Sequence, residues 1–265
     1  MFKMLINTII HKPQNPVAVI IPIYKRELSS YEKISLARCL SVLGNFPVIV
    51  IAPVRLSDSL IRSQTSSNVL IEHFDDSYFA DIDGYNRLML TVEFYERFKK
   101  YAYILIHQLD AFVFSNQLIE WCRRGYDYVG APWIGIDMVK FVDNHFDHGI
   151  GKYLRYIGMK PKHVGNGGFS LRKVKSAMIA LSLLKKTAKN WTHYEDIFWS
   201  IEVPKHLLFF FKIPDANIAR KFSFELEPRR CYKDNFNRLP FGCHAWQKYD
   251  IDFWRPFFKQ LGYVI

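Results

Sequence analysis

Residues 17–24 read VAVIIPIY, a continuous run of apolar and mostly β-branched side chains. A run of this length and composition is typical of a strand that is buried on both faces of a parallel sheet. Three further runs of this kind occur at residues 46–54, 69–74 and 101–109. Apolar side chains at helical spacing over residues 29–43 and 83–100 separate them. Strands that alternate with helices predict an α/β fold with a mainly parallel central sheet flanked by helices.

The composition places the chain among globular proteins. Of its 265 residues, 49% are apolar and 23% are charged, which excludes a disordered protein and allows a large core. We therefore expect a single domain over residues 1–265, with its core at about residues 17–246. No apolar run approaches the ~20 residues that span a bilayer, and the N-terminus lacks a signal-peptide pattern. The four cysteines are widely spaced, which favours a reducing, cytoplasmic compartment.

The positive charge is concentrated in one stretch. The chain carries a net charge of +11, and residues 140–190 hold nine lysines and two arginines against two aspartates. Such a stretch would attract phosphates, anionic lipids or nucleic acid, although a solvated basic loop has the same composition. Within it, residues 134–162 show no clear periodicity and predict a long, mobile insertion. Residues 209–265 contain four prolines and predict extended segments that wrap the core.

Four short segments hold candidate site residues. Asp110 follows the strand at residues 101–109, and ligands bind beyond the carboxyl ends of strands in open parallel sheets. Residues 165–168, GNGG, allow a ligand to approach the backbone closely, although a tight turn explains them equally well. Glu195 and Asp196 begin a predicted helix, either as capping residues or as a site for a general base. His244 follows Cys243, but adjacent side chains of an extended segment point to opposite faces, which argues against zinc.

Taken in this order, the segments resemble a glycosyltransferase of the GT-A type. They are similar to a bacterial family of sugar transferases that is described as a domain of unknown function, DUF5672. The likeness runs over residues 17–246. It is carried by the stretches VAVIIPIYKR, YNRLML, YILIHQLDAFVF, YDYVGAPW, VGNGGFSLR, YEDIFWS and PFGCHAW.

The resemblance implies a site for the nucleotide-sugar donor. The first strand and its loop would hold the base, which corresponds here to Ile21, Pro22, Tyr24 and Arg26. The D-x-D motif that binds Mn²⁺ or Mg²⁺ in such enzymes reads Gln108-Leu109-Asp110, so only its last aspartate is present and metal dependence stays open. His244 would be a second ligand of the cation. The cation, Arg87 or the basic stretch would offset the charge of the leaving diphosphate.

The resemblance also implies an acceptor side. Asn166, Gly167 and Gly168 would line the sugar and acceptor site, and Trp133 would stack on a sugar face. Asp196 would be the general base of an inverting transfer, with Glu195 positioning the acceptor or the helix start.

These expectations combine into one hypothesis. The protein would move a hexose from a nucleotide-sugar, most often a UDP-sugar in this fold, to a glycan or lipid-linked acceptor. Cell-surface polysaccharides such as lipopolysaccharide, O-antigen or capsule are the expected products, made in the cytoplasm by a protein attached peripherally to an anionic inner membrane face. One alternative is a non-catalytic sugar- or nucleotide-binding relative, prompted by the reduced D-x-D motif. Another is a nucleic-acid-binding protein, but the sequence contains no motif of that class.

Overall fold

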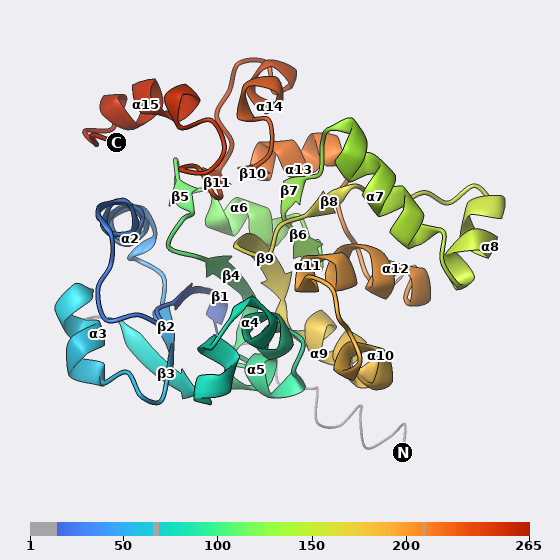
Figure 1. Ribbon diagram of the computed structural model, residues 1–265, viewed down its shortest axis with the longest axis horizontal. Helices are drawn as coiled ribbons and strands as arrows, with labels where there is room; N and C mark the ends of the chain where they lie inside the picture. Colours follow the sequence, from blue (N-terminus) through green and yellow to red (C-terminus); the bar gives the residue numbers. More distant parts are fainter. Residues whose placement is uncertain (1–14, 66–68, 209) are drawn as a thin grey trace.

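The computed structural model describes residues 15–65, 69–208 and 210–265, and a six-stranded sheet lies at its centre (Figure 1). Its order is β3-β2-β1-β4-β9-β6, in which β1 to β4 run parallel and β9 is antiparallel to both of its neighbours. The strands are β1 (Asn15–Pro22), β2 (Val48–Pro53), β3 (Leu70–Phe74), β4 (Tyr101–His107), β6 (Tyr128–Val129) and β9 (Phe169–Lys173). The predicted α/β fold is confirmed.

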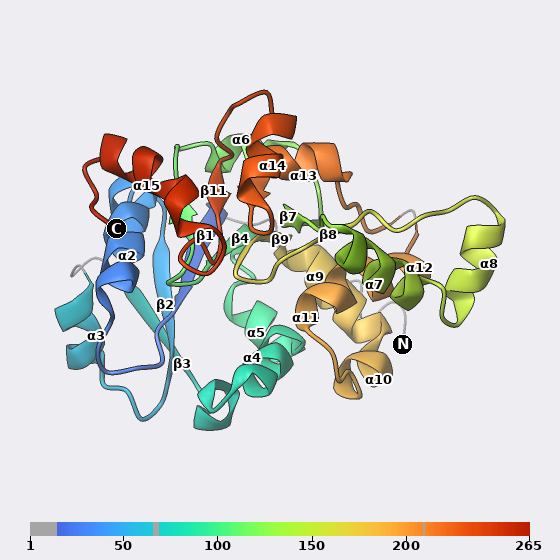
Figure 2. The same cartoon turned by 45° about the horizontal axis from the view of Figure 1, so that its top comes forward.

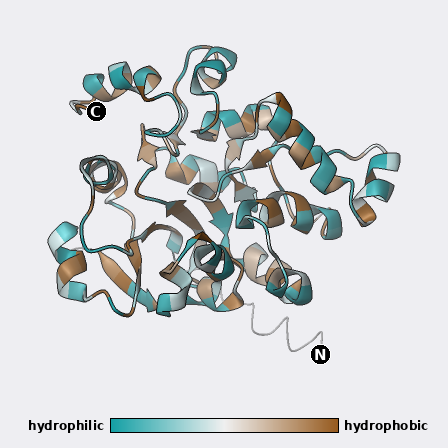
Figure 3. Cartoon of the chain, in the orientation of Figure 1, coloured by the Kyte–Doolittle hydropathy of each residue, from teal (hydrophilic) through white to brown (hydrophobic). Residues whose placement is uncertain are grey.

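Both faces of the sheet are covered, as the uninterrupted apolar runs require. Val17, Val19 and Ile21 of β1 point into one core, and Ala18 and Ile20 point into the other. Side chains of α2 (Ser30–Leu43), α3 (Asp58–Gln64) and α6 (Leu118–Arg123) pack in the first core. Side chains of α4 (Ile82–Met89), α5 (Val92–Arg97) and α9 (Val174–Leu183) pack in the second. Hydrophobic residues accordingly dominate the central strands in Figure 3.

Local capping explains where these helices begin and end. Ser29 and Glu32 form a capping box at the start of α2, and Gly44 ends the helix, as the sequence predicts. The single helix predicted over residues 83–100 is wrong, because the chain forms α4 and α5 with a break between them. The hydroxyl of Thr91 accepts a hydrogen bond from the amide of Phe94 (3.1 Å) and so starts a new helix.

The basic segment after residue 133 is more regular than expected. Residues 134–162 contain α7 (Ile136–Phe146) and α8 (Ile150–Tyr156), so the expected loss of periodic structure is wrong. Buried Val142, Phe146 and Leu154 form a small core with Trp133. These few apolar contacts are spread among polar residues, which hides the period in the sequence. The chain then continues, after β9, into α9 and α10 (Lys185–Lys189).

The C-terminal segment is helical rather than extended. It contains α13 (Ala216–Phe222), α14 (Pro228–Asp234) and α15 (Ile251–Gln260), so the expected extended conformation of this segment is wrong. Pro228 is the first residue of α14, a position where the missing amide costs nothing, and Pro256 lies inside α15. No helix in the described ranges is long and apolar enough to cross a membrane.

Two small sheets lie near the carboxyl end of β4. One has the order β10-β11-β5 and consists of β10 (Ser223–Phe224), β11 (Gly242–Cys243) and β5 (Phe112–Val113). The other pairs β7 (Ala131–Pro132) with β8 (Val164–Gly165). Three short elements complete this part of the chain: α11 (Glu195–Ile197), the π-helix η2 (Phe198–Glu202) and α12 (Val203–His206). Figure 2 shows α14 and α15 on the side of these small sheets that faces away from α4 and α5.

Candidate functional site

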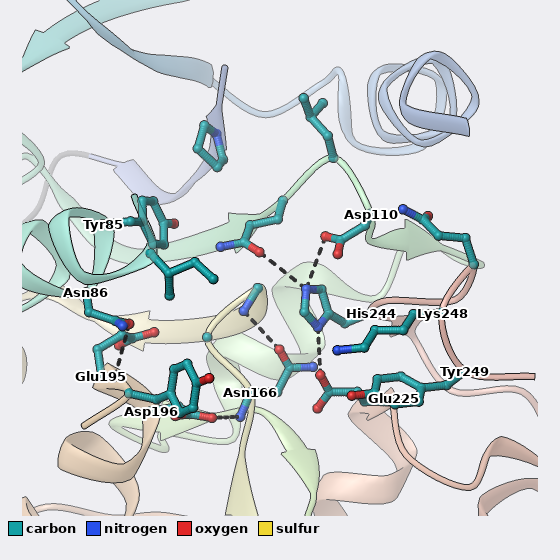
Figure 4. Close-up of a pocket in the computed structure, with 18 of the residues that line it drawn as sticks. Tyr85, Asn86, Asp110, Asn166, Glu195, Asp196, Glu225, His244, Lys248 and Tyr249 are labelled. Carbon is teal, nitrogen blue, oxygen red and sulfur yellow. Dashed lines mark hydrogen bonds and ion pairs between the residues drawn. The ribbon is translucent and has the colours of Figure 1, made fainter. Parts of the chain in front are cut away.

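A cavity of about 760 Å³ lies at the carboxyl ends of β1 and β4 (Figure 4). This volume is in the range of small-molecule sites. Ile20 of β1 pairs with Ile106 of β4, so Pro22 and Gln108 leave the sheet at the same edge. The cavity therefore occupies the place where an open parallel sheet binds its ligands.

The register of β9 brings the glycine turn to the same edge. His107 at the end of β4 pairs with Phe169 at the start of β9, and the amide of Gln108 donates to the carbonyl of Gly168 (2.8 Å). Residues 165–168 thus lie beside the Gln108-Leu109-Asp110 motif, although about 55 residues separate them in the sequence. The antiparallel insertion of β9 creates this contact.

The three-stranded sheet aligns three ionisable side chains in a row. Phe112 of β5 pairs with Cys243 of β11, and Cys243 pairs with Phe224 of β10. His244 and Glu225 directly follow Cys243 and Phe224, and Asp110 lies two residues before Phe112. The two ring nitrogens of His244 lie between the two carboxylates: Nε2 is 3.1 Å from Asp110 Oδ1, and Nδ1 is 2.9 Å from Glu225 Oε1. Gln108 Oε1 lies 3.3 Å from the same Nε2.

The two carboxylates decide the charge of His244. Burial by itself would lower the pKa of the imidazole, but Asp110 and Glu225 outweigh it and raise the pKa to about 10. Burial likewise opposes ionisation of Asp110, yet the neighbouring His244 keeps the pKa of this carboxyl below its usual value. Without a bound cation, the row is therefore an imidazolium held between two carboxylates at neutral pH.

The same row suits a divalent cation. Asp110 Oδ1 and Gln108 Oε1 both lie within hydrogen-bond distance of His244 Nε2, while Glu225 holds the other ring nitrogen as a carboxylate commonly does behind a metal-bound histidine. Within the described residues, no group of three or more His, Cys, Asp or Glu side chains is placed to hold a metal. A cation held by Asp110, Gln108 and His244 would therefore need water or phosphate oxygens as its remaining ligands.

The glycine turn is shaped by Asn166 rather than by glycine flexibility. Asn166 itself adopts the left-handed conformation (φ 79°), and its Oδ1 accepts hydrogen bonds from the amides of Gly168 (2.9 Å) and Phe169 (3.3 Å). The glycines are needed for space. A Cβ on Gly167 would lie 2.0 Å from Glu195 Oε1, and one on Gly168 would lie 2.0 Å from His244 Nε2. Their absent side chains let the turn touch both the acidic pair and the histidine.

Buried Arg172 of β9 holds Glu195 in place. Its guanidinium donates to Glu195 Oε1 (2.7 Å), to the carbonyl of Gly167 (3.3 Å) and to the hydroxyl of Tyr95 (3.1 Å). Arg172 and Glu195 are both almost fully buried, so each charge depends on the other. Tyr194 is the N-cap residue of α11 and makes no side-chain capping bond, so the ion pair with Arg172, not helix capping, accounts for Glu195.

Asp196 points away from this ion pair. Its Oδ2 accepts a hydrogen bond from the amide of Asn166 (2.9 Å), and its Oδ1 accepts one from the amide of Ile197 (2.9 Å). Burial, and after it the nearby charge of Glu195, raises the pKa of Asp196 to about 7. Figure 4 shows Asp196 and Asp110 on opposite sides of the cavity. Asp196 is thus a carboxylate with a proton affinity suited to neutral pH, set apart from the histidine row.

Four residues of the cavity wall carry a buried polar atom with no hydrogen-bond partner in the described structure: Tyr85, Asn166, Glu195 and Gln247. Two of these atoms belong to the glycine turn and to α11: the amide nitrogen Nδ2 of Asn166 and the carboxylate oxygen Oε2 of Glu195. One is a donor and the other an acceptor, and both residues are at most 3% exposed. An unpaired buried polar group is costly, so this pair is suited to a ligand that both donates and accepts hydrogen bonds, as hydroxyl groups do.

The cavity wall as a whole is acidic. Six of its side chains are carboxylates: Glu32, Asp81, Asp110, Glu195, Asp196 and Glu225. Lys25 neutralises Glu32 (2.6 Å), but Asp81 has no ion pair among the described residues. Lys248, which is exposed and labelled in Figure 4, is the lysine of the wall. An anionic ligand in this cavity therefore depends on Lys248, on His244 or on a bound cation.

Most of the residues predicted from the sequence meet at this cavity. The lining includes Pro22, Tyr24, Gln108, Asp110, Trp133, Asn166, Gly167, Gly168, Glu195, Asp196 and His244. Ile21, Arg26 and Arg87 do not line it. Ile21 is buried in the core, Arg26 lines a separate shallow depression with Arg55, and Arg87 is exposed on α4. The ring of Trp133 packs directly against Gly165. A Cβ on Gly165 would lie only 1.8 Å from this ring, so a larger residue does not fit at this position.

Several lining residues were not singled out from the sequence. They are Asn86, Glu225, Tyr194, Lys248 and Tyr249, and Asn86 Oδ1 accepts a hydrogen bond from the amide of Glu195 (3.3 Å). Asn86 lies in the family-like stretch YNRLML, and Lys248 lies four residues after His244, so proximity to those stretches was the available signal. No sequence signal pointed to Glu225, because only the pairing of β10 with β11 places it beside His244.

A protein-family model matches residues 68–244 and bears the description "Protein of unknown function (DUF5672)". The chain belongs to the DUF5672 family. No curated protein matches the sequence.

Solved structures of glycosyltransferases have the same fold as this DUF5672 protein. The galactosyltransferase LgtC, in complex with donor and acceptor sugar analogs, superposes with a TM-score of 0.53 at 14% identity, covering 86% of each chain. Mouse xyloside xylosyltransferase 1 gives a TM-score of 0.52 at 14% identity, with 86% of this chain and 97% of that chain covered. The bifunctional glycosyltransferase WbbM gives 0.52 at 16% identity over 89% of this chain and 46% of its own. The likeness establishes the GT-A fold.

Proposed function

We propose that this DUF5672 protein is a glycosyltransferase that moves a hexose from a nucleotide-sugar, with UDP as the expected nucleotide, to a hydroxyl of a glycan or lipid-linked acceptor. The observation that carries the proposal is the arrangement of one cavity: a phosphate-side row of Asp110, His244 and Glu225 faces an acidic residue of neutral-range pKa, Asp196. The fold shared with galactosyl- and xylosyltransferases supports the same reaction class.

In this proposal the nucleotide lies over the carboxyl end of β1. Pro22 and Tyr24 line that part of the cavity and would contact the base. Asp110, Gln108 and His244 would hold a Mn²⁺ or Mg²⁺ ion, with Glu225 orienting the histidine ring. When bound, the ion supplies positive charge for the diphosphate of the leaving group. Lys248 would contact the same phosphates directly.

The transferred sugar would sit between the glycine turn and α11. The unpaired Nδ2 of Asn166 and Oε2 of Glu195 would bind its hydroxyls, one as donor and one as acceptor. Gly167 and Gly168 leave room for the ring against the backbone. The rim residue Tyr194, which is 61% exposed, offers an aromatic face to the acceptor.

Asp196 would act as the general base of an inverting transfer. Its carboxylate takes the proton of the acceptor hydroxyl, and the hydroxyl oxygen forms a bond to the anomeric carbon. The bond from that carbon to the phosphate oxygen breaks, and the nucleoside diphosphate leaves with the electron pair. Burial is the main cause of the raised pKa of Asp196, and the charge of Glu195, which pairs with Arg172, adds to it.

The biological setting follows the sequence hypothesis. We propose that the acceptor is part of a bacterial surface polysaccharide such as lipopolysaccharide, O-antigen or capsule. An acceptor carried on a lipid would place the protein at the inner face of the cytoplasmic membrane as a peripheral component. The positive charge of residues 140–190 supports attraction to such a surface.

A panel of nucleotide-sugars tests the proposal. Each donor is added with and without Mn²⁺, and both the melting temperature and the release of nucleoside diphosphate are measured. We expect one donor to raise the melting temperature in the presence of Mn²⁺ and to undergo slow hydrolysis even without an acceptor. Failure of every donor to bind would refute the proposal. Binding without any release of nucleoside diphosphate would support the non-catalytic relative instead.

Lys248→Met should weaken donor binding without abolishing the fold. Lys248 is exposed at the cavity and makes a cation–π contact with Tyr249, so its removal costs little stability. Loss of a charged hydrogen bond to phosphate should weaken nucleoside diphosphate binding about 10- to 100-fold in calorimetry. Lys221→Gln, an exposed lysine of α13 outside the cavity, is the matched control. Equal affinities of Lys248→Met and wild type would show that Lys248 does not contact the diphosphate.

A further inference from the structure

Helices α7 and α8 form an arm, residues 134–163, at one end of the molecule. In Figures 1 and 2 α8 lies at the right-hand extremity, far from α2 and α3. The inner side of the arm is packed, with Val142, Phe146 and Leu154 buried against Ile197. Met138 of α7 lines the cavity, so the base of the arm is part of the cavity wall. The arm therefore connects the candidate active site to the periphery of the protein.

The outer face of α8 is apolar where a helix in water should be polar. Ile150, Tyr153 and Ile157 lie at positions i, i+3 and i+7 and are 46%, 63% and 53% exposed. Tyr156, next to this stripe, is 88% exposed. Isolated exposed apolar residues are ordinary, but the stripe and Tyr156 together make four large exposed side chains within residues 150–157, which marks a contact surface. Figure 3 shows hydrophobic residues on this helix beside hydrophilic ones.

The arm that carries the stripe also carries unpaired lysines. Lys140, Lys152, Lys160 and Lys162 are exposed, and none of them is paired with an acidic side chain in the described part of the chain. The acidic residues Asp143 and Asp147 are both engaged by Arg155, which leaves Asp137 as the exposed carboxylate of the arm. The arm therefore combines four unpaired positive charges with an exposed apolar face.

The basic stretch at residues 140–190 does not form one surface. Arg172 is buried beside Glu195, and Lys185, Lys186 and Lys189 lie on α10, which both views place well away from α8. Around α10 the large exposed apolar side chain is Leu183. Charge alone therefore does not single out the arm; the combination of lysines with an exposed aliphatic and tyrosine stripe does.

We propose that the α7–α8 arm docks on an anionic lipid surface. Tyrosines are enriched at the membrane interface because the ring is apolar and the hydroxyl stays hydrated, and lysines beside them are attracted to anionic headgroups. A helix with an apolar stripe and basic flanks lies in the plane of such an interface. The role of this docking rests on the proposed function. Because Met138 of the arm lies in the cavity wall, docking by the arm would present a lipid-linked acceptor to the active site.

Flotation with lipid vesicles tests the docking. Purified full-length protein is mixed with vesicles of phosphatidylcholine alone or with 30% phosphatidylglycerol. We expect binding to the anionic vesicles that falls as salt is raised, and weak binding to the neutral ones. Lys152→Glu/Lys160→Glu should lower partitioning about 30-fold, from about 1 kcal/mol for each lysine. Tyr153→Ser/Ile157→Ser should lower it about tenfold through lost apolar burial.

The matched control is Lys185→Glu/Lys186→Glu on α10, which makes the same charge change away from the arm. We expect this variant to bind vesicles like the wild type, with melting temperatures of all variants close together. Loss of binding in the α10 variant but not in the arm variants would overturn the proposal, as would wild-type binding to neither vesicle or equally to both. A wild-type dimer in light scattering that Tyr153→Ser/Ile157→Ser abolishes would also overturn it, since a second copy then covers the stripe.

The vesicle experiment is independent of catalysis. Partitioning is measured without a nucleotide-sugar, while release of nucleoside diphosphate from a soluble donor is measured without vesicles. Vesicle binding by a protein that turns over no donor would refute the transferase proposal and leave the docking surface intact. Donor turnover by a protein that does not bind vesicles would refute the docking proposal and leave the transferase proposal standing.

Discussion

Asp196→Asn should lower kcat by about 10²–10⁴-fold, the usual contribution of a positioned proton acceptor, while donor affinity stays within a few-fold of the wild type. The amide has nearly the same shape but only one acceptor oxygen, so it keeps one of the two backbone hydrogen bonds, from Asn166 or from Ile197, and it takes up no proton. Stopped product formation with retained nucleotide binding, measured by calorimetry, would identify a role in the chemical step. A variant with unchanged kcat would exclude Asp196 as the base.

The pH dependence provides a second readout of the same residue. Burial and the charge of Glu195 raise the pKa of Asp196 to about 7, and a base acts in its ionised form. The value of kcat/KM should therefore rise as pH increases through about 7 and level off above it. The residual activity of Asp196→Asn should lack this step. NMR of the product is the complementary measurement, because retention of the anomeric configuration would remove the need for this base.

The same raised pKa has a consequence for stability. A carboxyl whose pKa is higher in the folded state contributes stability that is fully present below the unfolded-state pKa of 3.8 and is lost as pH rises through about 7. The Asp196→Asn variant has no carboxyl at this position, so it does not lose this stability as the pH rises. The melting temperature of the variant, relative to the wild type, should therefore increase between pH 4 and pH 7 and then stay constant. A difference that is independent of pH would show that Asp196 ionises normally in the folded protein.

Glu195→Gln separates the two acidic residues. It leaves the buried guanidinium of Arg172 without its counter-charge, and breaking a buried pair in this way typically costs about 3–5 kcal/mol of stability. We therefore expect a marked fall in the melting temperature for Glu195→Gln. A comparable loss of stability in both variants would contradict the distinct roles assigned to them.

Asp110→Asn should weaken Mn²⁺-dependent binding of a nucleoside diphosphate by at least about 100-fold. Substitution of a residue that only holds a metal ligand in place typically lowers metal affinity about 10- to 100-fold, and loss of a ligand itself should cost at least as much. The substitution removes the carboxylate that faces His244 Nε2 at 3.1 Å. The measurement is calorimetry of UDP with Mn²⁺ and with chelator. In the wild type, chelator should reduce affinity to the level of the variant.

Asp81→Asn is the matched control for the metal prediction. Asp81 also lines the cavity, but its carboxylate caps α4 by accepting from the amide of Gly84 (2.6 Å), a role that asparagine fills well. We expect this variant to bind UDP and Mn²⁺ like the wild type. If chelator leaves wild-type turnover unchanged, the metal assignment is wrong, and the imidazolium of His244 and Lys248 would be the charges that face the diphosphate.

Sequence patterns were informative where the structural cause is local. The apolar runs at residues 17–24 and 101–109 predicted β1 and β4, because a strand buried on both faces has to be apolar at every position. The helical spacing of apolar residues over residues 29–43 predicted α2, which spans Ser30–Leu43. Local patterns failed where packing overrode them, as in the prolines of α14 and α15 and the sparsely apolar helices of the α7–α8 arm.

Part of the candidate site was also accessible from the sequence. Asp110 was identified because a strand end faces the ligand edge of a parallel sheet, and Asn166, Gly167 and Gly168 because a glycine-rich turn admits close contacts. The resemblance implied that Asp196 is the base and Glu195 a positioning residue, but the physical reason for this division was not accessible from the sequence. It depends on Arg172, which β9 carries into the core opposite α11, and a buried arginine leaves no periodic signal of its own.

The sequence by itself determined the strand-and-helix order, the ligand edge of the sheet and the chemical types of side chain gathered there, because each follows from spacing along a few turns of chain. Only the tertiary structure decided which of those side chains meet. Asp110, His244 and Glu225 come from three segments that strand register alone aligns, and the distances between them depend on hydrogen bonds that span more than 100 residues. Contacts of that range depend on how the whole chain packs, so no local pattern encodes them.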